Sequence, residues 1–413
     1  MKVFLALSAS ERKNLLLMFA AGLLFWSSIG SLLPTLPLYL RSLGMADQQL
    51  GFVMGAFAIG LLLARPSIGA IADSHSRKLV ILIGTAVCGL APLGYLLVQS
   101  VSSLMIVRSF HGISLAAFTT GYIALVTDIT PPKNRGEVLG YMSLINPVGV
   151  AFGPALGGFV QEAFGDRYLF LLTASFGFLA FLIMTQVQEN RRTNPSKKTD
   201  SSPAIQPGLW RLLLSPRIRI LSLVLLHVGL AFGGMSAFIS LLMEETGVNF
   251  NAGFFFTAAA IASFSIRLVA GPLSDRIGRG IFITFSLSLY AIAMFILTFA
   301  HTPWLFLISG FLEGAGFGLL IPTTSAIIAD RAYPHERGRL FGLCLGGFDL
   351  GIALAGPMAG LIAEAFSYQT LFICITVILI LGLLVFLTQS SKDLPHSLRY
   401  ALGRGQDIYS ASR

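Results

Sequence analysis

The chain has 413 residues, of which 55% are hydrophobic and only 11% are charged. A soluble globular protein carries about 25% charged residues, so these charges are too few to cover the surface of soluble domains. The high hydrophobicity also excludes a disordered chain. The composition therefore predicts an integral membrane protein that crosses the lipid bilayer several times.

Twelve apolar runs are long enough to cross a bilayer, which takes about 20 helical residues. In chain order, spans 1 to 12 have the approximate limits 14–40, 48–72, 79–99, 103–128, 138–161, 168–187, 218–243, 251–273, 281–300, 304–329, 339–363 and 370–389. The predicted fold class is an all-α integral membrane protein with twelve transmembrane helices.

One long polar connection separates the spans into two groups of six. The predicted domains are an N-terminal six-helix bundle, a cytosolic linker, a C-terminal six-helix bundle and a cytosolic tail, at 1–187, 188–217, 218–391 and 392–413.

The basic residues predict the orientation. Of the 28 Lys and Arg residues, Arg41 and Arg167 lie in one set of alternate loops, and Arg65, Arg108 and Arg267 lie within spans. All others lie in the tails, the linker and the opposite loops. Because basic loops stay in the cytosol, we expect both termini to be cytoplasmic, in a cell (inner or plasma) membrane. Despite the net charge of +9, basic residues spread over several short loops speak against a nucleic-acid partner.

The two halves of the chain are related by an internal repeat. An offset of 202 residues brings unusual residues into register: Arg65 with Arg267, Gly69 with Gly271, Asp73 with Asp275, Arg77 with Arg279, Gly112 with Gly314, Asp128 with Asp330, Arg135 with Arg337 and Gly140 with Gly342. One added residue later, Gly153-Pro154 meets Gly356-Pro357. We interpret this as duplication of a six-helix unit, a transporter architecture whose substrate site lies between the repeats.

A short motif recurs at the cytosolic ends of spans 2 and 8. A glycine is followed four residues later by an acid and after four more by an arginine: Gly69, Asp73 and Arg77, then Gly271, Asp275 and Arg279. It resembles the loop 2–3 signature of the major facilitator superfamily. The resemblance implies a charge cluster, joined by Asp128, Arg135, Asp330 and Arg337, that latches the cytosolic side. The alternative is that these charges only fix the topology.

Span 4 carries Arg108-Ser-Phe-His111-Gly112, which resembles motif B of the same superfamily, with His111 in place of a glutamine. An arginine inside a membrane costs about 2.5–3.5 kcal/mol on translocon scales, so we expect Arg108 to face a cavity and to have a partner. His111, three residues later, shares its helix face and is a candidate for proton transfer. The alternative is that Arg108 extends to the outer surface and His111 packs against a neighbouring helix.

Span 5 contains a spaced series of glycines around one proline: Gly140, Gly149, Gly153, Pro154, Gly157 and Gly158. The spacing matches motif C of the drug:proton antiporters in this superfamily. Glycines four residues apart allow close helix packing, and the proline removes a backbone hydrogen bond. The resemblance implies a gate that favours exchange over leak, whereas the alternative is a generic kinked helix.

Two acids lie within spans, Glu313 in span 10 and Asp349 in span 11. Glu313 is the first candidate for proton coupling and Asp349 the second, because a carboxyl group kept from water favours its neutral form. Glu313 is the repeat counterpart of His111, so the two are candidates to face each other across a central cavity. The alternatives are a neutral carboxyl bonded to a carbonyl, or a partner for Arg108. Further candidates to line the cavity are Phe25, Trp26, Asn146, His227, Phe232 and Met235.

The leading functional hypothesis is a proton-coupled exporter of small organic molecules that works by alternating access, with no cofactor and no metal, as a monomer. The alternatives are a proton-coupled uptake symporter and, third, a non-transporting receptor or scaffold. The sequence contains no HExxH, G-x-S-x-G or Walker A motif, so it predicts neither an enzyme nor an ATP-driven pump. Span 1 has no acid, unlike several relatives that export cations, so Arg108 and His111 suit anionic or zwitterionic solutes at least as well.

Overall fold

The computed structural model describes residues 7–189, 209–333 and 336–410, with backbone only at 209, 210, 269–272, 275 and 337. All regular elements in these ranges are helices: α2 (Ala9–Ser42), α3 (Asp47–Ser74), α4 (Arg77–Leu97), α5 (Val101–Ile129), η1 (Pro132–Asn134), α6 (Arg135–Met142), α7 (Ile145–Phe164), α8 (Asp166–Thr185), α9 (Leu209–Leu213), α10 (Arg219–Glu245), α11 (Gly253–Ile277), α12 (Arg279–Thr298), α13 (Pro303–Arg331), α14 (Arg337–Ala365), α15 (Tyr368–Gln389) and α16 (Leu394–Ala401).

The predicted fold class is confirmed. Among the described residues, eleven helical segments are long and apolar enough to cross a membrane, and α6 and α7 together form one of them. The remaining predicted span is α11, whose apolar stretch is Gly253–Leu268. Water cannot satisfy backbone groups in lipid, and a helix satisfies all of them within its own segment, so long apolar runs form helical spans.

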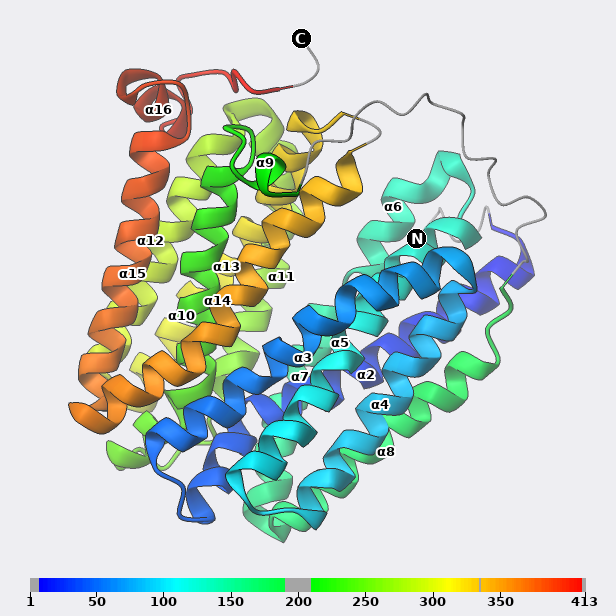
Figure 1. Cartoon of the computed structure of the whole chain (residues 1–413), viewed down its shortest axis with the longest axis vertical. Coiled ribbons are helices and arrows are strands. Elements are labelled where there is room, and N and C mark those ends of the chain that lie inside the picture. The colour runs from blue at the N-terminus through cyan, green and yellow to red at the C-terminus, as the bar shows by residue number, and fades with distance from the viewer. Residues whose placement is uncertain (1–6, 190–208, 334–335, 411–413) are drawn as a thin grey trace.

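The helices form two bundles, α2 to α8 and α10 to α15 (Figure 1). The bundles meet at one end, which we call the closed end, and separate towards the other end, where α6, α9 and α16 lie. Both chain termini are directed towards this second end, which we call the termini end. The limits predicted for the domains stay a prediction, and most of the linker, 190–208, lies outside the described residues.

The first span is longer than predicted. Helix α2 begins at Ala9 rather than near residue 14, because Ser8 and Glu11 form a reciprocal cap. The Glu11 amide donates to Ser8 Oγ at 3.2 Å, and the Ser8 amide donates to the Glu11 carboxylate at 2.8 Å. This capping box satisfies two amides that a helix start leaves free, so the polar segment before the apolar run is helical.

The fifth span is interrupted where the sequence predicts one helix over 138–161. Helix α6 ends at Met142 and α7 begins at Ile145. Pro147 has no amide hydrogen to donate to the Ser143 carbonyl, and it disfavours helical geometry at the residue before it. The break consists of Ser143 and Leu144, one turn before Pro147.

The C-terminal segment is folded against the second bundle, which its interpretation as a tail does not anticipate. Helix α16 is capped by Asp393, which accepts from the His396 amide at 2.9 Å. Asp407 pairs at 2.7 Å with Arg331, whose side chain is 2% exposed. The guanidinium of Arg331 also lies over the rings of Tyr400 and Tyr409. Residues 394–409 therefore cover the termini end of α13.

Candidate substrate cavity and gates

A cavity of about 240 Å³ lies between the two bundles, near the middle of the spans. Its walls are mostly apolar, and the aromatic members are Trp26, Phe57, Phe232, Phe256, Phe317 and Phe348. Charged and amide side chains enter it at five positions, Arg108, Asn146, Arg267, Glu313 and Asp349. A mainly apolar cavity with a few polar groups is typical of a site for small organic molecules.

Three predicted cavity residues lie elsewhere. Phe25 is buried within the first bundle and stacks on Phe118 with ring centroids 3.9 Å apart. Met235 is buried in the packed core of the second bundle. His227 is bonded through Nδ1 to the Leu223 carbonyl of its own helix at 2.7 Å. Each side chain is used in packing, so only Trp26, Asn146 and Phe232 of this predicted group line the cavity.

His111 is also absent from the cavity wall. It is fully buried, its Nδ1 lies 3.2 Å from the Tyr95 hydroxyl on α4, and its ring meets Phe57 edge-on. The side chain is directed at α4, so His111 and Glu313 do not face each other across this cavity. This corrects the expectation from the repeat, which fixes equivalent positions but not the direction of each side chain.

Arg108 lines the cavity, as its cost in a membrane predicts, and does not extend to the outer surface. The residue is 6% exposed, and its guanidinium carbon lies 4.6 Å from the Phe57 ring centroid. That geometry is a cation–π contact. Arg108 Nε has no hydrogen-bond partner among the described residues, and no ion pair with Glu313 is formed.

The two intramembrane acids differ in their partners. Glu313 on α13 is 4% exposed, lines the cavity, and lies next to the Tyr290 phenol of α12, with no cation paired to it in the described part of the chain. Asp349 on α14 pairs with Arg65 on α3 at 2.8 Å. This ion pair joins the two bundles. Sequence reasoning did not find it, although Arg65 was already visible as a charge within a span.

The closed end is sealed by close backbone packing. A Cβ built at Gly51 of α3 would lie 2.1 Å from the Gly356 carbonyl oxygen of α14, and one built at Gly360 would lie 2.5 Å from the Asp47 carbonyl oxygen. Only glycine fits at these contacts, since any side chain would force the helices apart.

Polar contacts reinforce the same seal between the bundles. The Tyr368 hydroxyl donates to Asp47 at 2.9 Å, and Arg41 binds both groups. The backbone amide of Gln48 donates to the Glu364 carboxylate at 3.0 Å. Sequence reasoning missed this network, and its only signal was Arg41, one of two basic residues in the outer loops.

The glycines of span 5 have three different environments. A Cβ at Gly153 would lie 2.4 Å from the Ser27 carbonyl oxygen, and Gly149 and Gly157 contact the same face of α2. Gly158 instead faces Asn251, which precedes α11 in the other bundle, and Pro154 packs on Gly30. No described residue lies within 4 Å of a Cβ built at Gly140 of α6. The motif therefore packs α7 within its bundle and, at one end, across the bundle interface.

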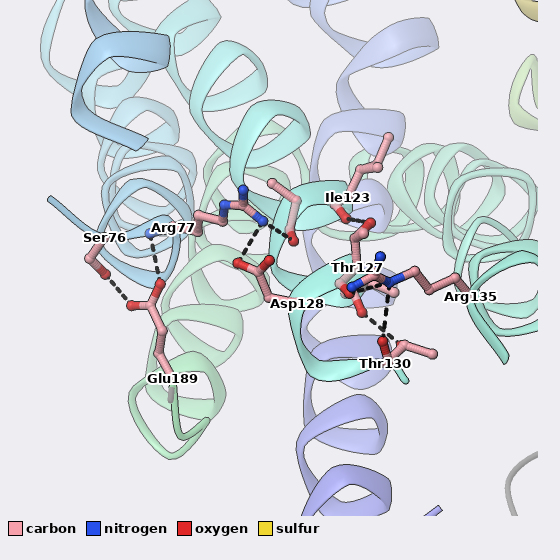
Figure 2. A network of polar contacts seen from close by, with 10 residues as sticks. Ser76, Arg77, Ile123, Thr127, Asp128, Thr130, Arg135 and Glu189 are labelled. Carbon is pink, nitrogen blue, oxygen red and sulfur yellow. Dashed lines mark hydrogen bonds and ion pairs between the residues drawn. The ribbon is translucent and has the colours of Figure 1, made fainter. Parts of the chain in front are cut away.

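The predicted charge cluster is divided between the bundles. Figure 2 shows the first half: Arg77 pairs with Asp128 at 2.5 Å, and Glu189 accepts from the Arg77 amide at 2.9 Å and from Ser76. Arg135 donates to the carbonyls of residues 127 and 130. In the second half, Arg279 pairs with Asp330. These contacts stay within one bundle each, so they do not join the bundles.

Of the remaining residues of the cluster, the structure describes Gly69 and Asp73, and these two do not close the termini end. Asp73 is exposed and forms no ion pair with a described residue, and a Cβ at Gly69 would meet nothing within 4 Å. The side chains of Asp275 and Arg337, and the surroundings of Gly271, lie outside the described residues. A second cavity lies here, with Gly140 and Tyr141 on one wall and Arg267 and Arg279 on the other. Because Arg267 lines both cavities, the central cavity leads towards this end.

Two apolar helical bundles around a central cavity, closed at one end, define a membrane transporter. The Major Facilitator Superfamily model matches residues 17–280 and 252–403. The chain belongs to this family, whose members are transporters and not enzymes.

Sequence relatives match this chain over most of its length, and solved structures share its fold. The quinolone resistance protein NorA of Staphylococcus aureus strain COL is 27% identical over 376 residues, 87% of this chain and 93% of that protein. The multidrug resistance protein MdtG of Serratia proteamaculans is 25% identical over 383 residues, 90% of this chain and 92% of that protein. The crystal structure of the nucleoside transporter NupG covers 92% of this chain and 99% of its own, with a TM-score of 0.72 at 15% identity. The human organic anion transporter MFSD10 has a TM-score of 0.64 at 18% identity and covers 92% of this chain and 100% of its own.

Proposed function

We propose that this transporter is a proton-driven exporter of small organic molecules, acting as a monomer in a cell membrane with both termini in the cytosol. The basic loops lie at the termini end, which supports this orientation. The closed end then faces outward, and the central cavity leads towards the cytosol, where an exporter collects its substrate.

One observation carries the proposed proton coupling. Glu313 is a buried carboxyl group in the cavity wall, without a cationic partner among the described residues. An ionised carboxylate in such surroundings is costly, so the group gains stability by taking up a proton or by meeting a positively charged ligand. The cavity then holds either a proton on Glu313 or a positively charged substrate, but not both. Alternating access of the two bundles exchanges one for the other across the membrane.

Export is supported by the glycine pattern of α7 and by the printed names of the two relatives, both of which are resistance proteins. Uptake by symport is the competing function, because the shared fold, which also occurs in a nucleoside transporter, does not decide the direction of transport. The two functions differ in the direction of solute flow relative to the proton.

Purified protein in liposomes tests this proposal. A pH-sensitive dye is enclosed, a panel of organic compounds is added, and proton and solute movements are recorded together. Proton movement opposite to solute flow is expected. Flow of both in one direction would contradict export.

The same liposomes test the role of Glu313. Glu313→Gln should abolish transport driven by a pH gradient, while exchange of labelled for unlabelled solute continues. Glu162→Gln, which removes an exposed carboxylate from α7, serves as the matched control and should behave as wild type. Normal pH-driven transport in Glu313→Gln would remove this residue from the coupling.

A further inference from the structure

Two interfaces join the bundles, that of α3 with α14 and that of α7 with α11. The internal repeat makes them equivalent, but they carry different charges. Arg65 on α3 and Arg267 on α11 are repeat partners. The offset that matches Gly153-Pro154 with Gly356-Pro357 also matches Asn146 on α7 with Asp349 on α14. Arg65 has a carboxylate partner from the opposite bundle, Asp349. At the equivalent position opposite Arg267, the chain provides the neutral amide of Asn146.

Among the described residues, Arg267 consequently has no counter-ion. Its Nε is buried without a hydrogen-bond partner, and it forms no ion pair with any residue that the structure describes. Arg267 as a whole is partly exposed, but burial of the Nε side of a guanidinium without a partner is unfavourable. The missing charge can come from a ligand, because Arg267 lines the central cavity that both bundles share.

The charge of the cavity as a whole also favours a ligand with a negative group. Asp349 is neutralised by Arg65. Among the described residues that line the cavity, this leaves the cations Arg108 and Arg267 against the single acid Glu313. Arg108 lies over the face of Phe57, which stabilises its charge in part. Arg267 has no such aromatic contact among the cation–π pairs of the described residues.

The packing of α11 on α13 sets the separation of Arg267 from Glu313. Built Cβ atoms on α13 meet α11 in regular steps, Gly310 at Phe255, Gly314 at Ala259 and Gly318 at Ser263. The two helices thus run in parallel, and Glu313 lies level with residue 258. Arg267 lies nine residues further along α11, a rise of about 13 Å, which its side chain shortens because helical side chains point towards the N-terminus.

We propose that Arg267 is the residue that binds the carboxylate of the substrate, and that the substrates are amphoteric: an aromatic body with a carboxylate at one end and a positively charged nitrogen at the other. The carboxylate pairs with Arg267 as Asp349 pairs with Arg65, and the aromatic body lies among Trp26, Phe232 and Phe317. The positive end reaches Glu313, where it competes with the proton. The competition between the positive end and the proton rests on the proposed function. The contact between Arg267 and the carboxylate of the substrate does not depend on it.

Binding of a matched pair of dyes tests the role of Arg267. Rhodamine B carries a free carboxylate and a delocalised positive charge, and its ethyl ester keeps only the positive charge. Affinities are measured by fluorescence polarisation with purified protein in lipid nanodiscs, without a pH gradient. A charge-assisted hydrogen bond to arginine should make the free acid bind about tenfold more tightly than the ester.

Variants test which residue causes the preference for the free acid over the ester. Arg267→Gln should remove the difference between the dyes, and Arg267→Lys should keep part of it. Asn146→Asp gives Arg267 an internal counter-ion and should also remove the difference. Glu313→Gln should weaken both dyes by the same factor, because the positive end is common to both. Arg219→Gln, which removes an exposed arginine at the start of α10, is the control and should retain the full difference. Melting temperatures of all variants show that each one is folded.

The outcomes separate this inference from the proposed function. Equal affinity of the wild type for acid and ester, no binding of either, or an unchanged preference in Arg267→Gln would overturn the role of Arg267. Binding with the expected preference but no proton-driven movement of rhodamine B in liposomes would overturn the exporter and leave the carboxylate site standing.

Discussion

Two glycines of the span 5 motif should respond in opposite ways to the same substitution. Gly153→Ala places a methyl group 2.4 Å from the Ser27 carbonyl oxygen, so α2 and α7 must separate, at a cost of about 1–3 kcal/mol for overpacking. Gly140→Ala meets nothing within 4 Å and should stabilise α6 by about 0.5–1 kcal/mol through the better helix propensity of alanine. Melting temperatures in detergent measure both. A loss of stability in Gly140→Ala that equals the loss in Gly153→Ala would contradict this packing.

The ion pair between Arg65 and Asp349 predicts a coupling between the two residues. Asp349→Asn leaves the arginine without its partner between the bundles, so it should destabilise the protein more than the double variant Arg65→Gln/Asp349→Asn does. We expect a coupling energy of about 1 kcal/mol in a double-mutant cycle, since Arg65 is partly exposed and solvent weakens the pair. Additive changes in the unfolding free energy would show that the pair does not contribute.

At the scale of an element, the C-terminal segment should stabilise the second bundle. Asp407→Asn removes the carboxylate that pairs with the buried Arg331, and loss of one partner of a buried pair costs about 3 kcal/mol. Thermal unfolding of the intact chain in detergent measures the change. Asp393→Asn, which keeps a capping side chain at α16, is the control and should change the melting temperature much less. If the two variants are equally stable, the Arg331 contact is not important for stability.

Hydropathy predicts the helices of this chain well, but not their ends and breaks. The limits of α2 and α7 depend on local hydrogen bonds, the Ser8 cap in one case and the missing amide of Pro147 in the other. Both signals are present in the sequence. Hydropathy does not detect them because an apolar run is read over some twenty residues, whereas a cap or a proline acts on one turn.

At the scale of the whole molecule, the network at the closed end should set the balance between conformations. Tyr368→Phe removes the hydroxyl that donates to Asp47, which weakens a contact between the bundles only when this end is closed. The population with a closed termini end should therefore increase. Spin labels at positions 133 and 276, on opposite bundles at the termini end, would report shorter distances in this variant.

The distances between the spin labels are compared with those of a control variant and of the wild type. Ser175→Ala removes an exposed hydroxyl that is bonded only within its own helix, and its distances should match the wild type. If Tyr368→Phe also leaves the distances unchanged, the contact at the closed end does not control the conformational balance.

The repeat shows where sequence reasoning about the site succeeded and where it stopped. It identified Arg77 with Asp128 and Arg279 with Asp330 as equivalent sets, and each set is paired within its own bundle. It could not show that Arg65 meets Asp349, because that contact depends on how far α3 and α14 are rotated and how closely their glycines allow them to approach.

The sequence by itself determined the membrane environment, the helical spans, the duplication and the family. The physical reason is that a long apolar run in lipid can satisfy all its backbone groups within its own segment only as a helix, so composition and run length are sufficient. Only the tertiary structure decided which side chains line the cavity. Arg108 enters it while His111, three residues later on the same helix, is bonded to Tyr95. The rotation of each helix is set by contacts with residues far away in the chain, and no single span contains that information.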